Sequence, residues 1–380
     1  MKPALVSLGA GRSQLPLFAA ARRRGLAVIG VDRDVGAAGL GACAAHVEAD
    51  THDAEAVLRG LAALEGLRVD GIVAGNPGPP ALTAALVADR LGLAGVRADA
   101  AHVAVSKSGQ RELARYAGLC VPDARTLAPG GAPETPGPPP WVVKPRVTRG
   151  GQVAIRRVEH ATALAQAVRE AAAASEDGCA EVEAWIPGRD VVVAGVFQDS
   201  IWTPCATLEE DTRFDADSRV AGWGLAAPAA LDAEQARVLA AAAADFVVRN
   251  ELGTGVLFAT FRVPEFGQPT FLQARLAQGG DDVDVLLAEL ELNELVVDLA
   301  TRRPVRAPSP GVSRVLRFLF HSDAGERLGR LTAASPTARV VLDRPREAGP
   351  RARVGYFVEA TEGPAENHRW AERVHELLER

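Results

Sequence analysis

The sequence predicts an α/β protein in which an open, Rossmann-like domain comes first and two α+β units follow it. Short apolar runs alternate with helical patterns through the first hundred residues, and this alternation is typical of a parallel sheet with helices on both faces. Beyond that region strands and helices mix without strict alternation, which indicates α+β units rather than a longer parallel sheet.

The first domain is expected to hold short apolar strands of the kind that parallel sheets bury. These strands are expected at 4–8, 27–32, 46–50 and 69–74, with helices from the turn after Gly11 to Arg24 and over 80–91.

The middle of the chain is expected to form a small α+β unit that surrounds a segment rich in proline and glycine, 127–140, with little regular structure. The elements of this unit are helices over 104–118 and 161–174 and strands at 141–144, 152–158, 181–185 and 190–197. The remainder is expected to contain strands at 256–262, 269–273, 338–342 and 355–359 and helices over 232–250, 281–298 and 364–379.

Composition indicates an ordinary globular protein of about two to three domains. The chain has 380 residues, 48% of them hydrophobic and 24% charged, with a net charge of −6, so we expect no nucleic-acid partner. Its four scattered cysteines show no C-x-x-C spacing, which favours a reduced, cytoplasmic setting over disulfides or zinc. No apolar stretch is long enough to span a bilayer and no secretory signal is visible, so we expect no membrane partner.

Two lysines stand in settings that indicate a polyphosphate site. Lys107 opens a predicted helix directly after Ser106, and Lys144 closes a predicted apolar strand. The glycines Gly150 and Gly151 follow that strand. A lysine at a strand end supplies a point charge, and a glycine turn supplies backbone N–H groups, so together they can hold phosphate oxygens.

The glycine turn at the start of the chain has a second interpretation. Gly9 and Gly11 follow the first strand and Asp32 ends the next one, as in dinucleotide-binding folds. That fingerprint needs a third glycine at position 14, where Gln14 stands. We therefore favour a structural or small-anion role for this turn. An NAD-linked enzyme is kept as a disfavoured alternative, and Arg12 and Gln14 could still face a substrate at this edge of the sheet.

The order of these features resembles the ATP-grasp superfamily, most closely its carboxylate–amine ligases related to carbamoyl-phosphate synthetase and biotin carboxylase. The resemblance is carried by motifs at 8–12, 31–33, 106–111, 117–122, 141–151, 183–190 and 351–359. It implies an ATP-grasp fold with a Rossmann-like pre-ATP-grasp domain (1–103), a small α+β lid subdomain (104–188) and a larger α+β C-terminal subdomain (189–380). Such a protein would clamp ATP between the last two and activate a carboxylate as an acyl phosphate, which an amine would then attack.

The resemblance also implies roles for single residues around the nucleotide. Lys107 and Lys144 would neutralise phosphate oxygens, and the backbones of Gly150 and Gly151 would approach the phosphates. Either Glu181 or Glu183 would accept a hydrogen bond from the adenine amino group or the ribose. Strand alternation puts both glutamates on one face, so the pattern does not choose between them.

The resemblance assigns the next segment to the hinge that grips adenine. There the backbone at 184–186, which includes Trp185 and Ile186, would read the purine edge. Asp190 would accept from a ribose hydroxyl.

The pattern breaks where related enzymes hold one or two Mg²⁺ ions with carboxylates. Thr260 lies near the position of the first acid, and Gln273 and Arg275 lie where Glu-x-Asn-x-Arg is expected. In one register Gln273 replaces the glutamate and Arg275 the asparagine. In the other, Gln273 replaces the asparagine, Phe271 stands at the glutamate position, and Arg275 keeps the family's arginine and would be catalytic. Both registers lose the acids.

Three explanations of this break stay open. Thr260 and Gln273 could bind Mg²⁺ weakly as neutral metal ligands, or nearby acids could replace the lost ones, or Arg275 could occupy the metal's place. The acids considered are Glu265, Asp281, Asp282 and the run 209–211. We expect that run, with Asp215 and Asp217, to be a solvated loop, and Asp281 and Asp282 either to cap the following helix or to contact a ligand.

Two functions follow from the resemblance. One is an ATP-dependent ligase that joins a small-molecule carboxylate to an amine or thiol, on an amino acid or small peptide, in biosynthesis. The other is a nucleotide-binding pseudoenzyme or regulatory protein that has lost the magnesium carboxylates. ATP is the expected cofactor, Mg²⁺ is doubtful, and a homodimer is possible.

Overall fold

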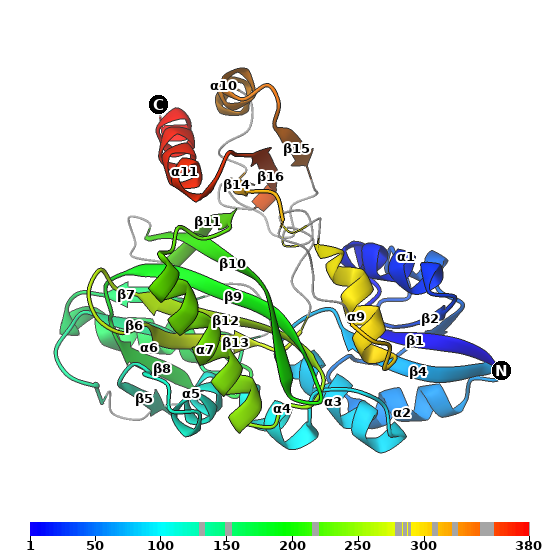
Figure 1. Ribbon diagram of the computed structural model, residues 1–380. Helices are drawn as coiled ribbons and strands as arrows, with labels where there is room; N and C mark the ends of the chain where they lie inside the picture. The colour runs from blue at the N-terminus through cyan, green and yellow to red at the C-terminus, as the bar shows by residue number, and fades with distance from the viewer. Residues whose placement is uncertain are drawn as a thin grey trace.

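The structure, a computed structural model, describes residues 1–128, 134–148, 154–214, 220–277, 283, 287, 290–305, 311–320, 326–342 and 353–379. Strands in this part of the chain form a four-stranded parallel sheet, a four-stranded antiparallel sheet and an eight-stranded antiparallel sheet (Figure 1). Gly150, Gly151, Asp215, Asp217, Asp281 and Asp282 lie outside the described residues.

The parallel sheet confirms the predicted Rossmann-like start. Its strands lie in the order β3-β2-β1-β4, and they are β1 (Lys2–Leu8), β2 (Ala27–Val31), β3 (Ala45–Val47) and β4 (Leu67–Ala74). The helices of this region are α1 (Leu15–Arg23), α2 (Ala54–Ala62) and α3 (Pro79–Leu91), with short 3-10 turns η1 (Arg12–Gln14) and η2 (Leu40–Ala42). Parallel neighbouring strands need crossover connections, which these helices supply. Every residue of β2 is buried, as expected for a strand inside a parallel sheet.

A helix from much later in the chain, α9 (Leu292–Ala300), packs against this sheet beside α1 (Figure 1). Arg23 donates to Glu294 across 271 positions of sequence, at 2.6 Å. Arg24 makes two hydrogen bonds of 2.8 Å to the Asp298 carboxylate. The first sheet is therefore covered by a segment distant in sequence, and the domain boundaries 1–103, 104–188 and 189–380 stay a prediction.

The small antiparallel sheet, which we call the lid sheet, has the order β5-β8-β6-β7 and is covered by α6 (Ala161–Ala174). Its strands are β5 (Ala124–Leu127), β6 (Trp141–Pro145), β7 (Arg156–Val158) and β8 (Ala180–Ala184). Apolar side chains at alternate positions of these strands, among them Trp141, Val143 and Val182, pack against Leu164 and other apolar residues of α6. The apolar runs seen in the sequence thus build a separate small core.

The helix predicted over 104–118 is confirmed with narrower bounds, because it begins at Lys107 and ends at Tyr116. The structure has α4 (Ala98–Ala104) and α5 (Lys107–Tyr116), with a break between them. The reason is the Ser106 side chain, whose Oγ accepts a hydrogen bond of 3.1 Å from the amide of Gly109 and so caps a new helix. This break makes Lys107 the first residue of α5.

The large sheet has the order β13-β12-β9-β10-β11-β14-β16-β15. Its strands are β9 (Arg189–Gln198), β10 (Ile201–Phe214), β11 (Val220–Ala227), β12 (Gly255–Val263), β13 (Thr270–Arg275), β14 (Arg314–Phe320), β15 (Arg339–Leu342) and β16 (Arg353–Ala360). Helix α7 (Ala233–Arg249) packs on β9 and β10, while α10 (Glu326–Ala334) and α11 (Pro364–Glu379) lie at the β14–β16 end (Figure 1).

The solvated loop expected at 209–211 is wrong, because these residues lie in the middle of β10. Pairing with β9 and β11 satisfies their backbone groups, and arginines neutralise the side chains: Glu209 pairs with Arg189 and Asp211 with Arg213.

Within the described residues no helix has the length and apolar character that a membrane span requires.

Gly71 in β4 tests how closely α9 packs on the first sheet. A Cβ at this position would lie 2.6 Å from the Ala300 carbonyl oxygen. We expect Gly71→Ala to lower the free energy of unfolding by about 1–3 kcal/mol, because backbone would have to move. Gly329→Ala in α10 is the matched control, since nothing lies within 4 Å of its added methyl group. Chemical denaturation measures both, and equal stability of the two variants would contradict the close packing.

Candidate functional site

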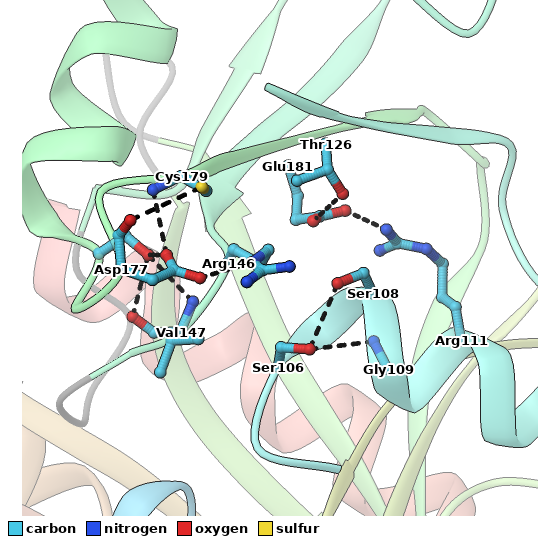
Figure 2. Close-up of polar contacts among 11 residues, drawn as sticks. Ser106, Ser108, Gly109, Arg111, Thr126, Arg146, Val147, Asp177, Cys179 and Glu181 are labelled. Atoms are coloured by element: carbon cyan, nitrogen blue, oxygen red, sulfur yellow. Dashed lines mark hydrogen bonds and ion pairs between the residues drawn. The ribbon is translucent and has the colours of Figure 1, made fainter. Parts of the chain in front are cut away.

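The end of β6 and the start of α5 are tied together. The amide of Lys107 donates to the carbonyl of Arg146 at 3.0 Å, and the Arg146 side chain donates to Asp177 at 2.5 Å. Figure 2 shows Arg146 close to the Ser106 cap and to the Asp177 turn. Lys107 and Lys144, 37 positions apart in sequence by residue number, are therefore held on adjoining elements.

These two lysines belong to a buried ionic cluster. Its members, each at most 7% exposed, are Lys107, Arg111, Lys144, Glu181 and Glu183. Arg111 follows Lys107 by one helical turn, so the two share a face of α5. Arg111 donates to Glu183 at 2.5 Å. It also donates to Glu181, as Figure 2 shows. Both glutamates thus lie on one face of β8, as strand alternation indicated.

Each of the four carboxylate oxygens in the cluster has a partner. The Lys144 ammonium lies 2.7 Å from the second oxygen of Glu183, and the Thr126 hydroxyl donates to Glu181 at 2.6 Å. The expected acceptors for an adenine amino group are therefore engaged with the protein's own cations in this structure. Arg111 is a residue whose part in this cluster the sequence analysis did not anticipate.

Lys107 differs from the other cations of the cluster. Its ammonium forms no hydrogen bond or ion pair within the described part of the chain. Burial, and then the nearby Lys144, lower the pKa of Lys107 to about 7, although Glu183 and Glu181 favour its charged form. The cluster holds three cationic side chains against two carboxylates, so an anionic ligand would complete its charge balance.

The hinge after β8 is held by an arginine of the large sheet. Arg262 on β12 donates to Asp190 at 2.6 Å and to the carbonyl of Ile186 at 2.6 Å. Its guanidinium lies 4.4 Å from the ring centroid of Trp185, and that of Arg157 lies 4.7 Å from the same ring, which are cation–π distances. Asp190, expected to accept from a ribose, is bound to Arg262 here.

The hinge backbone is mostly committed to the lid. The amide of Ala184 donates to Asp123 at 2.9 Å and that of Trp185 to Pro140 at 3.0 Å. The amide of Ile186 has no partner in the part of the chain that the structure describes. Of the three amides expected to read a purine edge, this one is available as a donor.

The place expected for magnesium lies on one face of the large sheet. Thr260 pairs directly with Gln273, whose amide nitrogen lies 3.5 Å from the threonine hydroxyl. Two residues further on, Arg275 lies 3.2 Å from Glu210, a residue of the run that was expected to be a loop. Alternation puts Thr260, Gln273 and Arg275 on the same face.

These residues do not fit a magnesium ion. Mg²⁺ takes oxygen ligands and is usually bound through carboxylates, whereas Thr260 and Gln273 are neutral and Arg275 is a cation. The acids of this face, Asp190 and Glu210, are paired with Arg262 and Arg275. The described residues contain no group of three side chains suited to a metal.

The glycine turn of the first sheet is braced from within. The Asp32 carboxylate accepts from the amide of Ala10 at 2.9 Å and from that of Asp34 at 3.0 Å. The buried Gln14 side chain fills the space beside Gly75, where a Cβ would lie 2.5 Å from its amide nitrogen. These contacts support the structural role favoured for this turn.

Comparison with known proteins identifies the fold. No family model and no curated protein matches the sequence. Among solved structures, a carboxyaminoimidazole ribonucleotide synthase from Aspergillus clavatus complexed with ATP is similar with a TM-score of 0.78 and 17% identity over 100% of this chain and 98% of its own. An L-amino acid ligase from Bacillus licheniformis is similar with a TM-score of 0.75 and 16% identity over 99% of this chain and 98% of its own.

A phosphoribosylglycinamide synthetase from Anaerococcus prevotii covers 99% of this chain and 98% of its own length, with a TM-score of 0.69 and 14% identity. The chain thus has the ATP-grasp fold, a mixed α/β architecture shared along almost its whole length with these proteins. The fold predicted from the order of motifs is confirmed.

Arg111 is expected to contribute most to the stability of the buried cluster. Arg111→Met would leave Glu181 and Glu183 with fewer countercharges in a buried site, and we expect it to cost roughly 3–5 kcal/mol of the free energy of unfolding. Arg115→Met, one turn later on α5 at an exposed position, should cost less than about 0.5 kcal/mol. Urea denaturation measures both, and a small effect at Arg111 would contradict its proposed part in the cluster.

Proposed function

We propose that this chain binds ATP between the lid sheet and the large sheet and is an ATP-dependent carboxylate–amine ligase. Its substrates would be a small-molecule carboxylate and an amine or thiol, with an amino acid or small peptide as the substrate class. The observation that carries the proposal is the buried, unpaired ammonium of Lys107 beside Lys144 in a chain with the ATP-grasp fold.

The electrostatics of the lid support a triphosphate as the ligand. Lys107 is 7% exposed and its ammonium has no anionic partner in contact within the described residues. A buried cation without a close countercharge is unfavourable, and a phosphate oxygen would relieve that cost. Lys144 could share its ammonium between Glu183 and a phosphate, because an ammonium has three donors.

The proposed reaction joins two steps at this site. A carboxylate oxygen of the substrate attacks the γ-phosphorus of ATP, and ADP leaves. The amine then attacks the acyl carbon and loses a proton, and inorganic phosphate leaves with the bonding electrons and takes up that proton. In this scheme Lys107 and Lys144 offset charge on the phosphate oxygens, the amide of Ile186 donates to the base, and Arg262 holds the hinge in place through Asp190.

A second candidate, favoured by the magnesium face, is a protein that binds the nucleotide without turning it over. The observation behind it is that Thr260 and Gln273 stand where carboxylates are expected, with Arg275 paired to Glu210. Losing the metal's charge would remove several kcal/mol of stabilisation from phosphoryl transfer. The ligase and this binding protein therefore differ in turnover, and they agree on nucleotide binding.

An ADP-release screen separates the two candidates. We expect purified protein with ATP to release ADP when the correct amino acid or peptide pair is added, and Lys107→Ala/Lys144→Ala to abolish release. Tight ATP binding with no ADP release over all amino acids and their pairs would favour the binding protein. Calorimetry that detects no ATP binding to the parent protein would exclude both.

The pH dependence of ATP binding tests the part assigned to Lys107. Its pKa is lowered to about 7, and a bound polyphosphate would raise it, so binding takes up a proton above pH 7. Affinity is therefore expected to fall as the pH rises from about 7.5 to about 9, a window above the phosphate pKa of roughly 6.

Lys107→Met should weaken binding about tenfold or more at the lower pH and flatten this slope, since the lost charge-assisted bonds are worth about 1.5–3 kcal/mol. Calorimetric titration across the window measures both effects. An affinity that does not change with pH in the parent protein, or an equal slope in the variant, would show that Lys107 does not contact the phosphates.

A further inference from the structure

The Arg275 side chain has more hydrogen-bonding capacity than its partners use. Its guanidinium has five N–H donors, one of which meets Glu210 at 3.2 Å. The Nε atom is buried and has no hydrogen-bond partner, and the group lies 5.7 Å from the ring centroid of Phe258. Buried donors without acceptors are unfavourable, so this arginine is suited to a further anionic acceptor.

The surroundings of Arg275 favour an anion over a cation. Thr260 and Gln273 offer neutral oxygens, and these are poor substitutes for carboxylates around a divalent ion. A guanidinium two residues from Gln273 would repel such an ion, whereas it would attract a phosphate in the bidentate geometry that arginine favours. The charge that related sites would take from a metal is already present here as a side chain.

Helix α5 is in contact with the strand that carries Arg275. Gln110 on α5 accepts a hydrogen bond of 3.0 Å from the amide of Ala274, the residue between Gln273 and Arg275. Lys107 and Arg111 flank Gln110 on the same helix. The unpaired lysine and the under-used arginine therefore belong to two elements that are in direct contact.

We propose that this site binds a polyphosphate without a divalent cation, with the Arg275 guanidinium turning from Glu210 to the phosphate and Lys107 contacting it from the lid. The ligand class is an inorganic polyphosphate or the polyphosphate of a nucleotide, and the nucleotide part rests on the proposed function. Arg275 thereby takes the place that a magnesium ion would fill between carboxylates.

The test is calorimetric titration with tripolyphosphate and, separately, with ATP, each in EDTA and in excess Mg²⁺. We expect tripolyphosphate to bind in EDTA with an affinity within about threefold of that in Mg²⁺. Arg275→Gln should weaken binding in EDTA at least tenfold. Arg275→Lys should lose less affinity, because lysine keeps the positive charge although it lacks the paired N–H donors of a guanidinium. Arg237→Gln on α7, the same change in an exposed ion pair, should bind like the parent protein.

The two probes keep this inference apart from the proposed function. Binding of tripolyphosphate that appears only with Mg²⁺, or that Arg275→Gln leaves unchanged, would overturn the inference. ATP binding that requires Mg²⁺ would do the same while leaving nucleotide binding intact. Tripolyphosphate binding in EDTA that depends on Arg275, with no binding of ATP, would support the inference and overturn the nucleotide part of the proposed function.

Discussion

The buried contact between Arg111 and the glutamates of β8 is the interaction on which the site depends. Burying five ionisable side chains is costly unless each charge meets a partner. Here Arg111 donates to both Glu181 and Glu183. Lys144 pairs with the second oxygen of Glu183, and the Thr126 hydroxyl donates to Glu181. This network attaches α5 to the lid sheet, and it leaves Lys107 as the cation without a partner in contact among the described residues.

A second set of arginines organises the large sheet in the same way. Arg262 donates hydrogen bonds to Asp190 and to the hinge carbonyl of Ile186. On the same face of the sheet, Arg275 forms an ion pair with Glu210. Carboxylates that could have gathered around a metal are instead paired with guanidinium groups. A guanidinium binds carboxylate and phosphate with the same pair of N–H donors, so these arginines have the chemistry to bind either group.

The sequence was most informative where the local pattern decides the structure. The alternation of apolar runs and helices in the first hundred residues produced the parallel sheet, because buried strands and crossovers leave that signature. Lys144 was placed at a strand end because an apolar run stops on it. The run 209–211 was misread as a loop, since a strand of charged residues shows no apolar alternation. The start of α5 at Lys107, directly after the Ser106 cap, was predicted, whereas the preceding helix α4 was not.

What the sequence by itself determined is therefore the order of the elements, the ATP-grasp fold, and the residue types that break the magnesium pattern. The tertiary structure alone decided which charges meet. Arg262 faces Asp190 and Arg275 lies near Glu210 because the strand order β13-β12-β9-β10 brings these strands together from distant parts of the chain. Likewise α9 covers the first sheet across 271 positions. Such pairings depend on long-range packing, and no local periodicity records them.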